Sequence, residues 1–452
     1  MRYYFVGIKG AGMSALAQLL RARGHAVEGS DVAQHFFTDT LLAQRGISVH
    51  RGFSAGHLKS GVDRLVYSTA YQAADHVELL EAQRRSIPCE SYPEAVGRFM
   101  REYRCIAVAG THGKTTTAAL VAYILQQAGY DPSAIIGGDV PAFGGNVRVG
   151  GSRWLVLEAD EYQNKFLHYS PSDVLLLNIE YDHPDFFATP AAYTEVFSAF
   201  VSRCPTKGAL VMNADDPAVA AIAAGMGNRA VLFGESGHAD FRLQHAFWSG
   251  GWQHMVLYHA GRHYECVTTL PGRHNAMNIL AAAALCRVLG VDWNIIQQSC
   301  RAFSGVRRRF ELKGEYRGAV IIDDYAHHPT AISAVVQTAR ERYPSKRIVV
   351  VFQPHTFSRT RALLKEFARS LSADMILLLE IYASAREQQF HGVSSGDLLK
   401  MLPATGRARL VAGVEDAATI LKKEVGRSDV VLLLGAGETG KIADLLLHPS
   451  TV

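Results

Sequence analysis

The chain has 452 residues, of which 48% are hydrophobic and 19% are charged, fractions typical of a globular protein. This length exceeds one ordinary hydrophobic core and predicts two to four domains, three being the natural number at about 150 residues each. The formal net charge is +4, and the basic residues are scattered apart from Arg307–Arg309. This small and dispersed excess of positive charge is no argument for a nucleic-acid partner, because anionic small molecules would suit it equally well.

The cysteines and the apolar runs indicate a cytoplasmic protein. The six cysteines include no C-x-x-C pair, which predicts reduced core thiols rather than a disulfide or zinc framework. The chain opens directly as a strand, without a separate signal segment. The longest apolar runs, such as 375–379 and 430–434, have the length of strands and do not approach a membrane span.

The first predicted unit is a strand, a glycine turn and a helix at residues 3–14. Gly7, Gly10 and Gly12 form the pattern G-x-x-G-x-G. A second strand at 25–29 leads to Asp31, about where Rossmann folds hold a ribose or a base. The pattern is weak evidence alone, and a glycine turn without a ligand is the alternative.

The central signal is Gly110-Thr-His-Gly-Lys-Thr-Thr-Thr117, between an apolar strand at 105–109 and an Ala/Leu-rich helix. Glycines let backbone N–H groups surround a polyphosphate at a helix N-terminus. Lys114 can reach the β- and γ-phosphates, and the Thr115 hydroxyl can bind Mg²⁺. Val108 stands where the standard P-loop pattern needs glycine, so this is a shortened loop. The alternative, a glycine turn that only packs a helix on a strand, does not explain the Lys-Thr pair.

Acids follow two predicted strands beside this loop, at 155–161 and 175–183. Acids at the carboxyl ends of such strands are natural Mg²⁺ ligands, and Glu158 and His183 are the first choices. Asp160, Glu161 and Asp182 are candidates to support them. The alternatives are a solvated strand end for Glu158 and an ordinary histidine for His183, since the chain has 19 histidines.

Further candidates follow in the last third of the chain. A predicted helix at 279–289 follows Asn275 and Asn278, one predicted to cap the helix and the other to contact a nucleotide. The strand that ends in Asp323 and Asp324 would make a poor core, because burying an unpaired carboxylate costs several kcal/mol. After the strand at 347–352, two side chains could hold a carboxylate, with a solvated helix start as the alternative: His355 and Arg359.

The end of the chain repeats the strand, glycine loop and helix pattern. Residues 435–441 fit G-x-x-x-x-G-K, but Ile442 replaces the hydroxyl residue that would bind Mg²⁺. We therefore expect no second ATP site there, and instead a backbone loop near a substrate carboxylate. Alternating strands and helices throughout predict an α/β fold with three domains in series, at 1–97, 98–304 and 305–452.

These motifs together resemble the Mur ligase family, the ATP-dependent amide ligases of peptidoglycan synthesis. The resemblance covers nearly the whole chain and rests on ordered motifs that are specific in combination. They lie at 5–14, 110–117, 158–161, 178–183, 274–278, 308–311, 323–330 and 352–359. The resemblance implies a Rossmann-like UDP-binding domain, a central ATP-binding domain and a Rossmann-like C-terminal domain. It also implies a role in cell wall biogenesis and hence in cell shape and division.

The best-matching subgroup joins L-alanine to UDP-N-acetylmuramate. The family implies that the muramate carboxylate attacks the γ-phosphate of ATP to give an acyl phosphate, which the alanine amine then attacks. Since the first step brings two anions together, positioning and charge stabilisation must dominate. The implied requirements are ATP and Mg²⁺, with Mn²⁺ as an alternative. The implied partners are small molecules, with no nucleic acid or membrane, and the chain is expected to be a monomer or weak dimer.

The resemblance also implies roles for individual residues. ATP would contact Gly110, Thr111, His112, Gly113, Lys114, Thr115, Thr116, Asn278, Arg309 and Asp324. The metal would bind Thr115, Glu158 and His183. The UDP-sugar would contact Gly10, Gly12, Met13, Ser14 and Asp31. The amino acid would contact Tyr325, His327, His355 and Arg359, and catalysis would depend on Lys114, His183, His327 and His355.

Three departures from the subgroup pattern bear on the choice of substrate. Thr356 stands where an Arg is common after the Q-P-H motif, and Ser68–Tyr71 differs from the common Ser-Ser-Ala-Ile form on the UDP side. The segment 161–169 is similar to the related ligase that attaches a recycled tripeptide to UDP-muramate. A tripeptide ligase and a non-catalytic UDP-sugar or nucleotide sensor are therefore the alternatives, although a sensor does not need the motif at 323–328.

Overall fold

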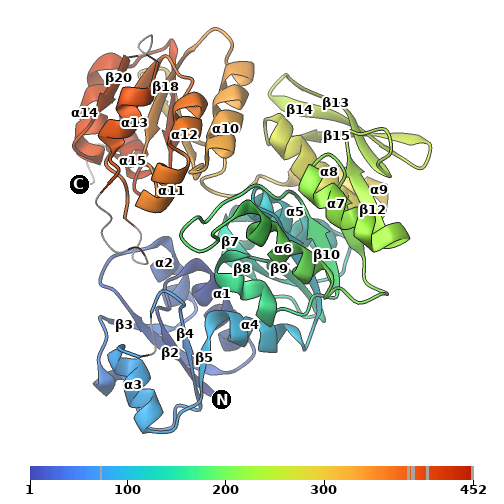
Figure 1. Ribbon diagram of the computed structural model, residues 1–452, viewed down its shortest axis with the longest axis vertical. Coiled ribbons are helices and arrows are strands. Elements are labelled where there is room, and N and C mark those ends of the chain that lie inside the picture. The colour runs from blue at the N-terminus through green and yellow to red at the C-terminus, as the bar shows by residue number, and fades with distance from the viewer. Residues whose placement is uncertain (72–73, 384–386, 388–391, 404–406, 449–452) are drawn as a thin grey trace. The chain divides into compact units, whose positions relative to one another are not determined.

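The computed structural model describes residues 1–71, 74–383, 387, 392–403 and 407–448. Three β-sheets follow one another along the chain, and their strands are connected largely through helices (Figure 1). The predicted α/β class with three domains in series is confirmed, whereas the exact domain boundaries stay a prediction. Contacts group the chain into two compact units, described separately below: Met1–Ile179, Thr194–Arg242 and Leu280–Phe303, and Glu180–Tyr193, Leu243–Ile279 and Ser304–Val452.

The first sheet has the strand order β3-β2-β1-β4-β5, and all of its pairings are parallel. This is the Rossmann strand order without its sixth strand, in agreement with the predicted Rossmann-like domain. The strands are β1 (Arg2–Val6), β2 (Ala26–Asp31), β3 (Ser48–Arg51), β4 (Arg64–Tyr67) and β5 (Cys89–Ser91). The helices are α1 (Ala11–Ala22), α2 (Phe37–Gln44), η1 (Ala55–His57), α3 (Val77–Arg84) and α4 (Tyr92–Met100).

The second sheet begins in the first unit with the order β13-β12-β11-β10-β6-β9-β7-β8. Its strands there are β6 (Arg104–Ala109), β7 (Ser133–Val140), β8 (Gly145–Arg148), β9 (Trp154–Glu158), β10 (Asp173–Leu176), β11 (Leu210–Asn213) and β12 (Ala230–Gly234). β13 (Phe241–Ser249) continues into the second unit, where β14 (Trp252–His259) and β15 (Arg262–Thr268) form an antiparallel pair. Because β6 pairs in parallel with both β9 and β10, their carboxyl ends lie at one edge.

Helices and short 3₁₀ turns connect the strands of the second sheet. They are α5 (Lys114–Gln127), η2 (Pro141–Phe143), η3 (Tyr162–His168), α6 (Pro190–Val201), α7 (Pro217–Met226), η4 (Gly227–Arg229), α8 (Arg273–Val288) and α9 (Trp293–Ala302). The prediction that an asparagine caps the helix after residue 278 was wrong. The helix starts at Arg273, so Asn275 and Asn278 lie inside it, and Asn275 donates its side-chain N–H to the carbonyl of Pro271.

The third sheet has the order β16-β17-β21-β18-β19-β20. Its strands are β16 (Glu311–Tyr316), β17 (Ala319–Asp324), β18 (Arg347–Phe352), β19 (Met375–Leu378), β20 (Arg407–Leu410) and β21 (Asp429–Leu434). Its helices are α10 (Pro329–Arg342), α11 (Phe357–Ala362), α12 (Leu364–Ser370), α13 (Ser395–Met401), α14 (Val414–Glu424) and α15 (Lys441–Leu447). β16 is the antiparallel edge strand, and the other pairings are parallel.

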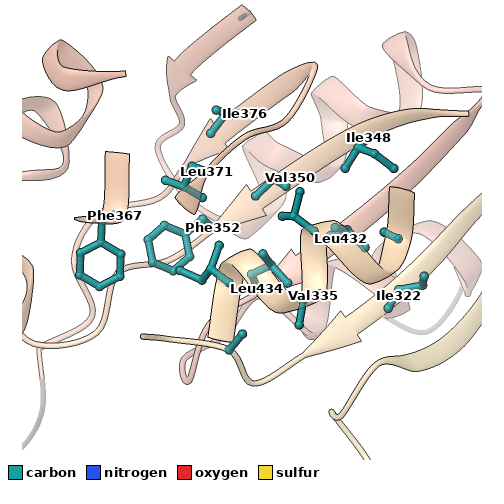
Figure 2. Close-up of a cluster of buried hydrophobic side chains, with 14 of the residues drawn as sticks. Ile322, Val335, Ile348, Val350, Phe352, Phe367, Leu371, Ile376, Leu432 and Leu434 are labelled. Carbon is teal, nitrogen blue, oxygen red and sulfur yellow. The ribbon is translucent and has the colours of Figure 1, made fainter. Parts of the chain in front are cut away.

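The third sheet is buried on both faces, which explains why its strands read as continuous apolar runs. On one face, Val350, Phe352, Leu432 and Leu434 pack with Val335 of α10 and neighbouring apolar side chains (Figure 2). The alternate residues of the same strands pack against α14 and α15 on the other face. Two apolar faces fix this sheet firmly, so the loops at its carboxyl edge have a rigid base.

All six cysteines are free, and five of them are buried, as the absence of paired spacings predicts. Within the described residues, no helix combines the length and the apolar character needed to cross a membrane.

Candidate functional site

The central glycine loop connects β6 to α5 and has a backbone that requires its glycines. Gly110 has φ +143°, and a Cβ there would lie 3.1 Å from the backbone N and O of Asn178. Gly113 has φ +81° and directly precedes the first residue of α5. The N-terminus of a 14-residue helix therefore faces the loop, which is the arrangement that binds phosphate groups in P-loops.

Asn178, just beyond the end of β10, fixes the shape of this loop. Its carbonyl oxygen accepts from the N–H of Thr111 at 3.0 Å, and its Oδ1 accepts from the N–H of His112 at 2.7 Å. Its Nδ2 donates to the carbonyl of His112 at 3.0 Å. Three hydrogen bonds to two consecutive loop residues hold the backbone in one conformation, so Asn178 belongs with the predicted loop residues.

Lys114 is held at the mouth of the loop. Its Nζ donates to Gly110 O at 2.5 Å, Thr111 O at 3.3 Å and Glu161 Oε2 at 2.9 Å. Burial by itself would lower the pKa of Lys114, but the carboxylates of Glu161 and Asp160 outweigh this effect, so that pKa is raised. The ammonium therefore keeps its charge at neutral pH, as stabilising a transferring phosphoryl group requires.

The next residue, Thr115, points its hydroxyl at Glu158, the last residue of β9. Thr115 Oγ1 donates to Glu158 Oε1 at 2.8 Å, and the N–H of Gly137 donates to Glu158 Oε2 at 2.5 Å. A hydroxyl and a carboxylate oxygen so close together are the hard oxygen ligands that Mg²⁺ prefers. These two residues therefore fit a magnesium ion. Thr116 is buried behind them.

The first glycine loop lies at the carboxyl ends of β1 and β2 in the same unit. Gly10 precedes α1, and a Cβ at Gly12 would lie 2.4 Å from the hydroxyl oxygen of Tyr92. Asp31 is buried, and its carboxylate accepts from the N–H of Lys9 at 2.7 Å and of Val32 at 2.8 Å. Burial is the main reason that the pKa of Asp31 is raised.

The side chains of Met13 and Ser14 are buried in α1, where Gln18 donates to the Ser14 hydroxyl at 3.1 Å. Of the five predicted UDP-sugar residues, only Gly10 lies in the loop itself, and Gly12, Met13 and Ser14 lie in the first turn of α1. Asp31 ends β2 and holds the loop through the N–H of Lys9.

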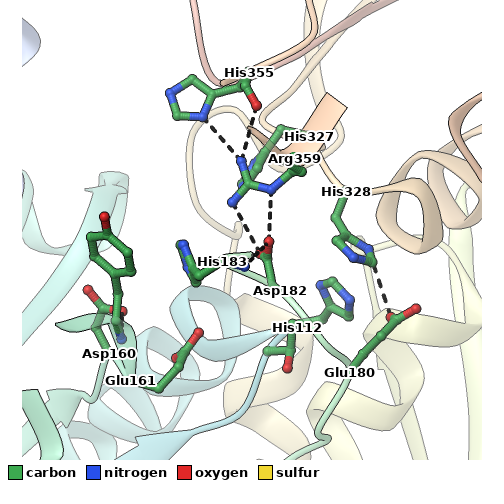
Figure 3. A network of polar contacts seen from close by, with 12 residues as sticks. His112, Asp160, Glu161, Glu180, Asp182, His183, His327, His328, His355 and Arg359 are labelled. Carbon is green, nitrogen blue, oxygen red and sulfur yellow. Dashed lines mark hydrogen bonds and ion pairs between the residues drawn. The ribbon is translucent and has the colours of Figure 1, made fainter. Parts of the chain in front are cut away.

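In the second unit, Arg359 lies between Asp182 and His355 (Figure 3). Its Nε and Nη2 donate to the two Asp182 oxygens at 2.8 and 3.2 Å, and its Nη1 lies 3.2 Å from His355 Nδ1. Burial alone would raise the pKa of Asp182, but the guanidinium of Arg359 holds it well below its usual range. Arg359 therefore forms a bidentate contact with a carboxylate of the chain itself, and its predicted contact with a substrate carboxylate stays a prediction.

The two histidines beside this clamp are held neutral. His327 and His355 are in edge-to-face contact, with ring centroids 5.9 Å apart. Burial and then the charge of Arg359 lower the pKa of His355 to about 4 and that of His327 well below its usual range. His327 Nδ1 also lies 2.8 Å from the carbonyl oxygen of Tyr325. Both imidazoles are therefore uncharged at neutral pH and resist protonation, and each can act as a neutral hydrogen-bonding group.

His183 follows Asp182 with a φ of +57°, a conformation that a residue other than glycine rarely adopts. Its N–H donates to Asp182 Oδ1 at 2.7 Å. His183 lies in the loop that follows β10, and backbone strain of this kind is concentrated at functional sites. Glu158 and His183 belong to different compact units, and their joint role as metal ligands stays a prediction.

The remaining predicted nucleotide contacts lie in the second unit. Both Asp324 oxygens accept backbone N–H groups, from Phe310 at 2.6 Å and Ala326 at 2.7 Å. Arg309 lies over the ring of Tyr325, 5.3 Å from its centroid. Asp324 therefore shapes the turn that presents Arg309 and Tyr325. Asn278 is buried and donates to Asn275 Oδ1 at 3.3 Å.

Models of one protein family match almost the entire chain. The Mur ligase family catalytic domain matches residues 2–104, the Mur ligase middle domain residues 108–286, and the Mur ligase glutamate ligase domain residues 308–437. Proteins named UDP-N-acetylmuramate–L-alanine ligase are 40% identical in Desulfitobacterium hafniense (99% of both chains) and 40% identical in Stenotrophomonas maltophilia (98% of this chain and 94% of the other).

Solved structures agree with this assignment. The UDP-N-acetylmuramate–alanine ligase of Thermotoga maritima has a TM-score of 0.84 at 28% identity, with 99% of each chain covered. A murein peptide ligase of Psychrobacter arcticus has a TM-score of 0.74 at 25% identity, covering 99% of this chain and 98% of the other. With family models on all three regions and relatives of 40% identity over the full length, the chain belongs to the Mur ligase family.

Proposed function

We propose that this protein is an ATP-dependent ligase that joins L-alanine to UDP-N-acetylmuramate in peptidoglycan precursor synthesis. The observation that carries the proposal is the central loop, where Lys114 and Thr115 meet the acids after β9. The function named for the relatives of 40% identity supports the choice of substrates. The products are the muramoyl-alanine amide, ADP and inorganic phosphate.

The first step transfers the γ-phosphate of ATP to the muramate carboxylate and gives an acyl phosphate. In the free protein, the Lys114 ammonium donates hydrogen bonds to Glu161 and to the Gly110 carbonyl. On ATP binding, the phosphates take over as partners of Lys114 and of the loop N–H groups that Asn178 holds in place. These fixed positive groups offset the repulsion between phosphate and carboxylate, which is the main barrier to this step.

Magnesium fits this loop through the Thr115 hydroxyl and the Glu158 carboxylate, with His183 as a proposed third ligand. When bound, the ion would neutralise charge on the phosphate oxygens. A Thr115→Ala variant should need more Mg²⁺ for half-maximal activity, and Thr115→Ser should restore most of the wild-type dependence. An unchanged Mg²⁺ dependence in Thr115→Ala would contradict the assignment of this hydroxyl.

In the second step, the alanine amine attacks the acyl carbon, and phosphate leaves. His327 and His355 are the proposed residues that orient the amine. Their lowered pKa values keep both imidazoles uncharged, so neither repels the amino acid as a cation would. Arg359 is the proposed partner of the alanine carboxylate. Its guanidinium is held by Asp182 and His355, which fixes its orientation before the amino acid arrives.

The proposal also covers nucleotide contacts by Asn278, Arg309 and Asp324, sugar contacts by the first glycine loop, a monomeric or weakly dimeric state, and a cytoplasmic location.

One test addresses the reaction itself. Phosphate release should require ATP, Mg²⁺, UDP-N-acetylmuramate and L-alanine together, and mass spectrometry should detect the muramoyl-alanine amide. Binding of all substrates without any amide would instead indicate a sensor.

A tripeptide ligase is the second candidate, because segment 161–169 departs from the alanine-ligase pattern and a murein peptide ligase has a similar fold. Competition between L-alanine and the tripeptide distinguishes the two. Under our proposal, alanine alone supports turnover and excess tripeptide does not slow it. Amide formation only with the tripeptide would replace alanine as the nucleophile.

A further inference from the structure

The turn after the acids of β9 has an unusual backbone. In η3, Gln163 has φ 55° and ψ 33°, and Asn164 has φ 55° and ψ 31°. Two consecutive non-glycine residues in the left-handed region are strained, and glutamine is poorly suited to it. Such strain persists only where the surroundings impose it, and it is concentrated at binding and catalytic sites. The turn therefore holds the next residue, Lys165, in a required position.

Lys165 is a buried cation with unused hydrogen-bonding capacity. Its side chain is only 7% exposed, and its Nζ forms an ion pair with Asp160 Oδ2 and lies 5.6 Å from the ring centroid of Tyr162. An ammonium has three N–H donors, but within the described residues the only hydrogen-bond acceptor of Lys165 is Asp160. Lys114, by contrast, has three acceptors. Lys165 can therefore engage an additional anion.

Contacts of the neighbouring residues place this pair near two glycine loops of the first unit. Glu161, which follows Asp160, accepts from Lys114 of the central loop at 2.9 Å. The turn η3, which contains Lys165, packs against α4. Helix α4 begins at Tyr92, whose hydroxyl lies against Gly12 at the start of α1. The Asp160–Lys165 pair is thus close to the proposed phosphate loop and to the helix that contacts the proposed UDP-sugar loop.

An acceptor held by the first loop must present its carboxylate to the γ-phosphate at the central loop. We propose that Lys165 is a further substrate-positioning residue, whose ammonium binds the lactyl carboxylate of UDP-N-acetylmuramate, with Asp160 as its partner while the site is free. This inference rests on the proposed function. It assigns a role to a second lysine in addition to Lys114. Lys114 binds the phosphates, and Lys165 binds the carboxylate of the acceptor.

The test compares two ligands that differ in the carboxylate. UDP-N-acetylglucosamine has the same nucleotide and amino sugar as UDP-N-acetylmuramate but no lactyl acid. Calorimetric Kd values for both are measured without ATP or Mg²⁺ for the wild type, Lys165→Met, Lys165→Arg and the control Lys207→Met. Lys207 is an exposed lysine outside both loops. Circular dichroism and thermal unfolding check the fold of each variant.

We expect the wild type to prefer the muramate, and Lys165→Met to lose about tenfold or more in muramate affinity. Its affinity for the glucosamine ligand should stay within about twofold of the wild-type value, since that ligand has no acid to contact. Lys165→Arg should recover part of the preference, and Lys207→Met should not change it. If Lys165→Met weakens both ligands equally, or neither, the role of Lys165 is overturned. A wild type without preference for the muramate overturns the proposed function as well.

If Lys165→Met does not fold, Asp160→Asn gives the decisive result. Removing the resident carboxylate frees Lys165, so the muramate should bind more tightly and the glucosamine ligand should not. Unchanged affinity for both ligands would overturn the proposal.

Discussion

The central loop at 110–117 and the C-terminal loop at 435–441 share one plan, in which a buried parallel strand leads through glycines to a lysine and a helix. In the central loop, Lys114 is 14% exposed and donates to the loop carbonyls and Glu161. In the C-terminal loop, Lys441 is 62% exposed and pairs only with Glu438, three residues earlier, within the described chain. The lysine is directed inward in one loop and outward in the other.

The residue after each lysine shows the same contrast. Thr115 directs its hydroxyl to Glu158, whereas Ile442 is fully buried in the core against α14 and the third sheet. The C-terminal helix α15 has only seven residues, half the length of α5. The difference teaches that the glycine-lysine spacing is not sufficient for a nucleotide site. The side chains of neighbouring strand ends decide whether the loop faces a ligand or the core.

The sharpest test of the contrast between the two loops is to replace Lys114 of the central loop. Lys114→Met should lower the rate of phosphate release by about 10²–10³-fold, because the lost cation stabilises charge in the transition state. The unfolding temperature should fall, because the buried Glu161 loses its cation, but circular dichroism should still show the wild-type fold at the assay temperature, which separates chemistry from folding. Turnover near the wild-type rate would contradict the role of the central loop.

The second test concerns the acid beneath the C-terminal loop. Asp323 is buried, and a Cβ at Gly440 would lie 2.8 Å from its Oδ2. Burial, partly offset by Arg308, raises the pKa of Asp323 from 3.8 to about 6. Between these values the folded state binds more protons than the unfolded state, so the contribution of Asp323 to the free energy of unfolding falls as the pH rises.

Asp323→Asn removes the free-energy cost of ionising this buried carboxyl group. We expect the stability of the variant relative to wild type to increase by up to about 3 kcal/mol between pH 4 and pH 7, measured by urea unfolding. Asp397→Asn is the control with the opposite sign, because hydrogen bonds from Ser394 and Lys400 lower the pKa of this exposed carboxyl. A pH-independent difference for Asp323→Asn would show that this acid does not resist ionisation.

A third test gives the C-terminal loop the hydroxyl that it lacks. Ile442→Thr completes the P-loop pattern but places a hydroxyl in the apolar core, at an expected loss of about 1–3 kcal/mol in the free energy of unfolding. It should create no second ATP site, so the nucleotide-binding stoichiometry should stay at one. Ile442→Val, which keeps the site apolar, should lose only about 0.5–1.5 kcal/mol. A stoichiometry of two in Ile442→Thr would refute our interpretation of the loop.

The smallest expected effect belongs to Lys441. Its pair with Glu438 is solvated, and such surface pairs contribute at most about 1 kcal/mol. Lys441→Met should therefore change turnover by less than about twofold and should hardly shift the unfolding temperature. A loss as large as that of Lys114→Met would place the two loops in the same class.

Much of the fold could be predicted from local patterns. The central strand, loop and helix appear where the apolar run, glycines and Ala/Leu segment predicted them, because each part is specified by neighbouring residues. The start of α8 was missed, because the helix includes the segment 273–278, in which four of the six residues are polar and no apolar periodicity is evident. The domain boundaries stay a prediction, and the division into two compact units follows from contacts between segments that are distant in sequence.

The candidate site was predictable only in its parts. The motif 178–183 was recognised, but the three hydrogen bonds by which Asn178 shapes the loop depend on β10 lying next to β6. Arg359 was predicted as a carboxylate clamp, and its partnership with Asp182 joins residues 177 positions apart. Lys165 carried no signal of its own beyond standing in a segment that departs from the subgroup pattern.

The sequence by itself determined the class of fold, the family and the loop that carries the chemistry, because these depend on short-range patterns of glycine, apolar and charged residues. Only the tertiary structure decided which glycine loop faces acids and which faces the core, which acid holds each buried cation, and which histidines are neutral. Those properties arise from burial and from charges brought together by distant strands, and no spacing along the chain encodes them.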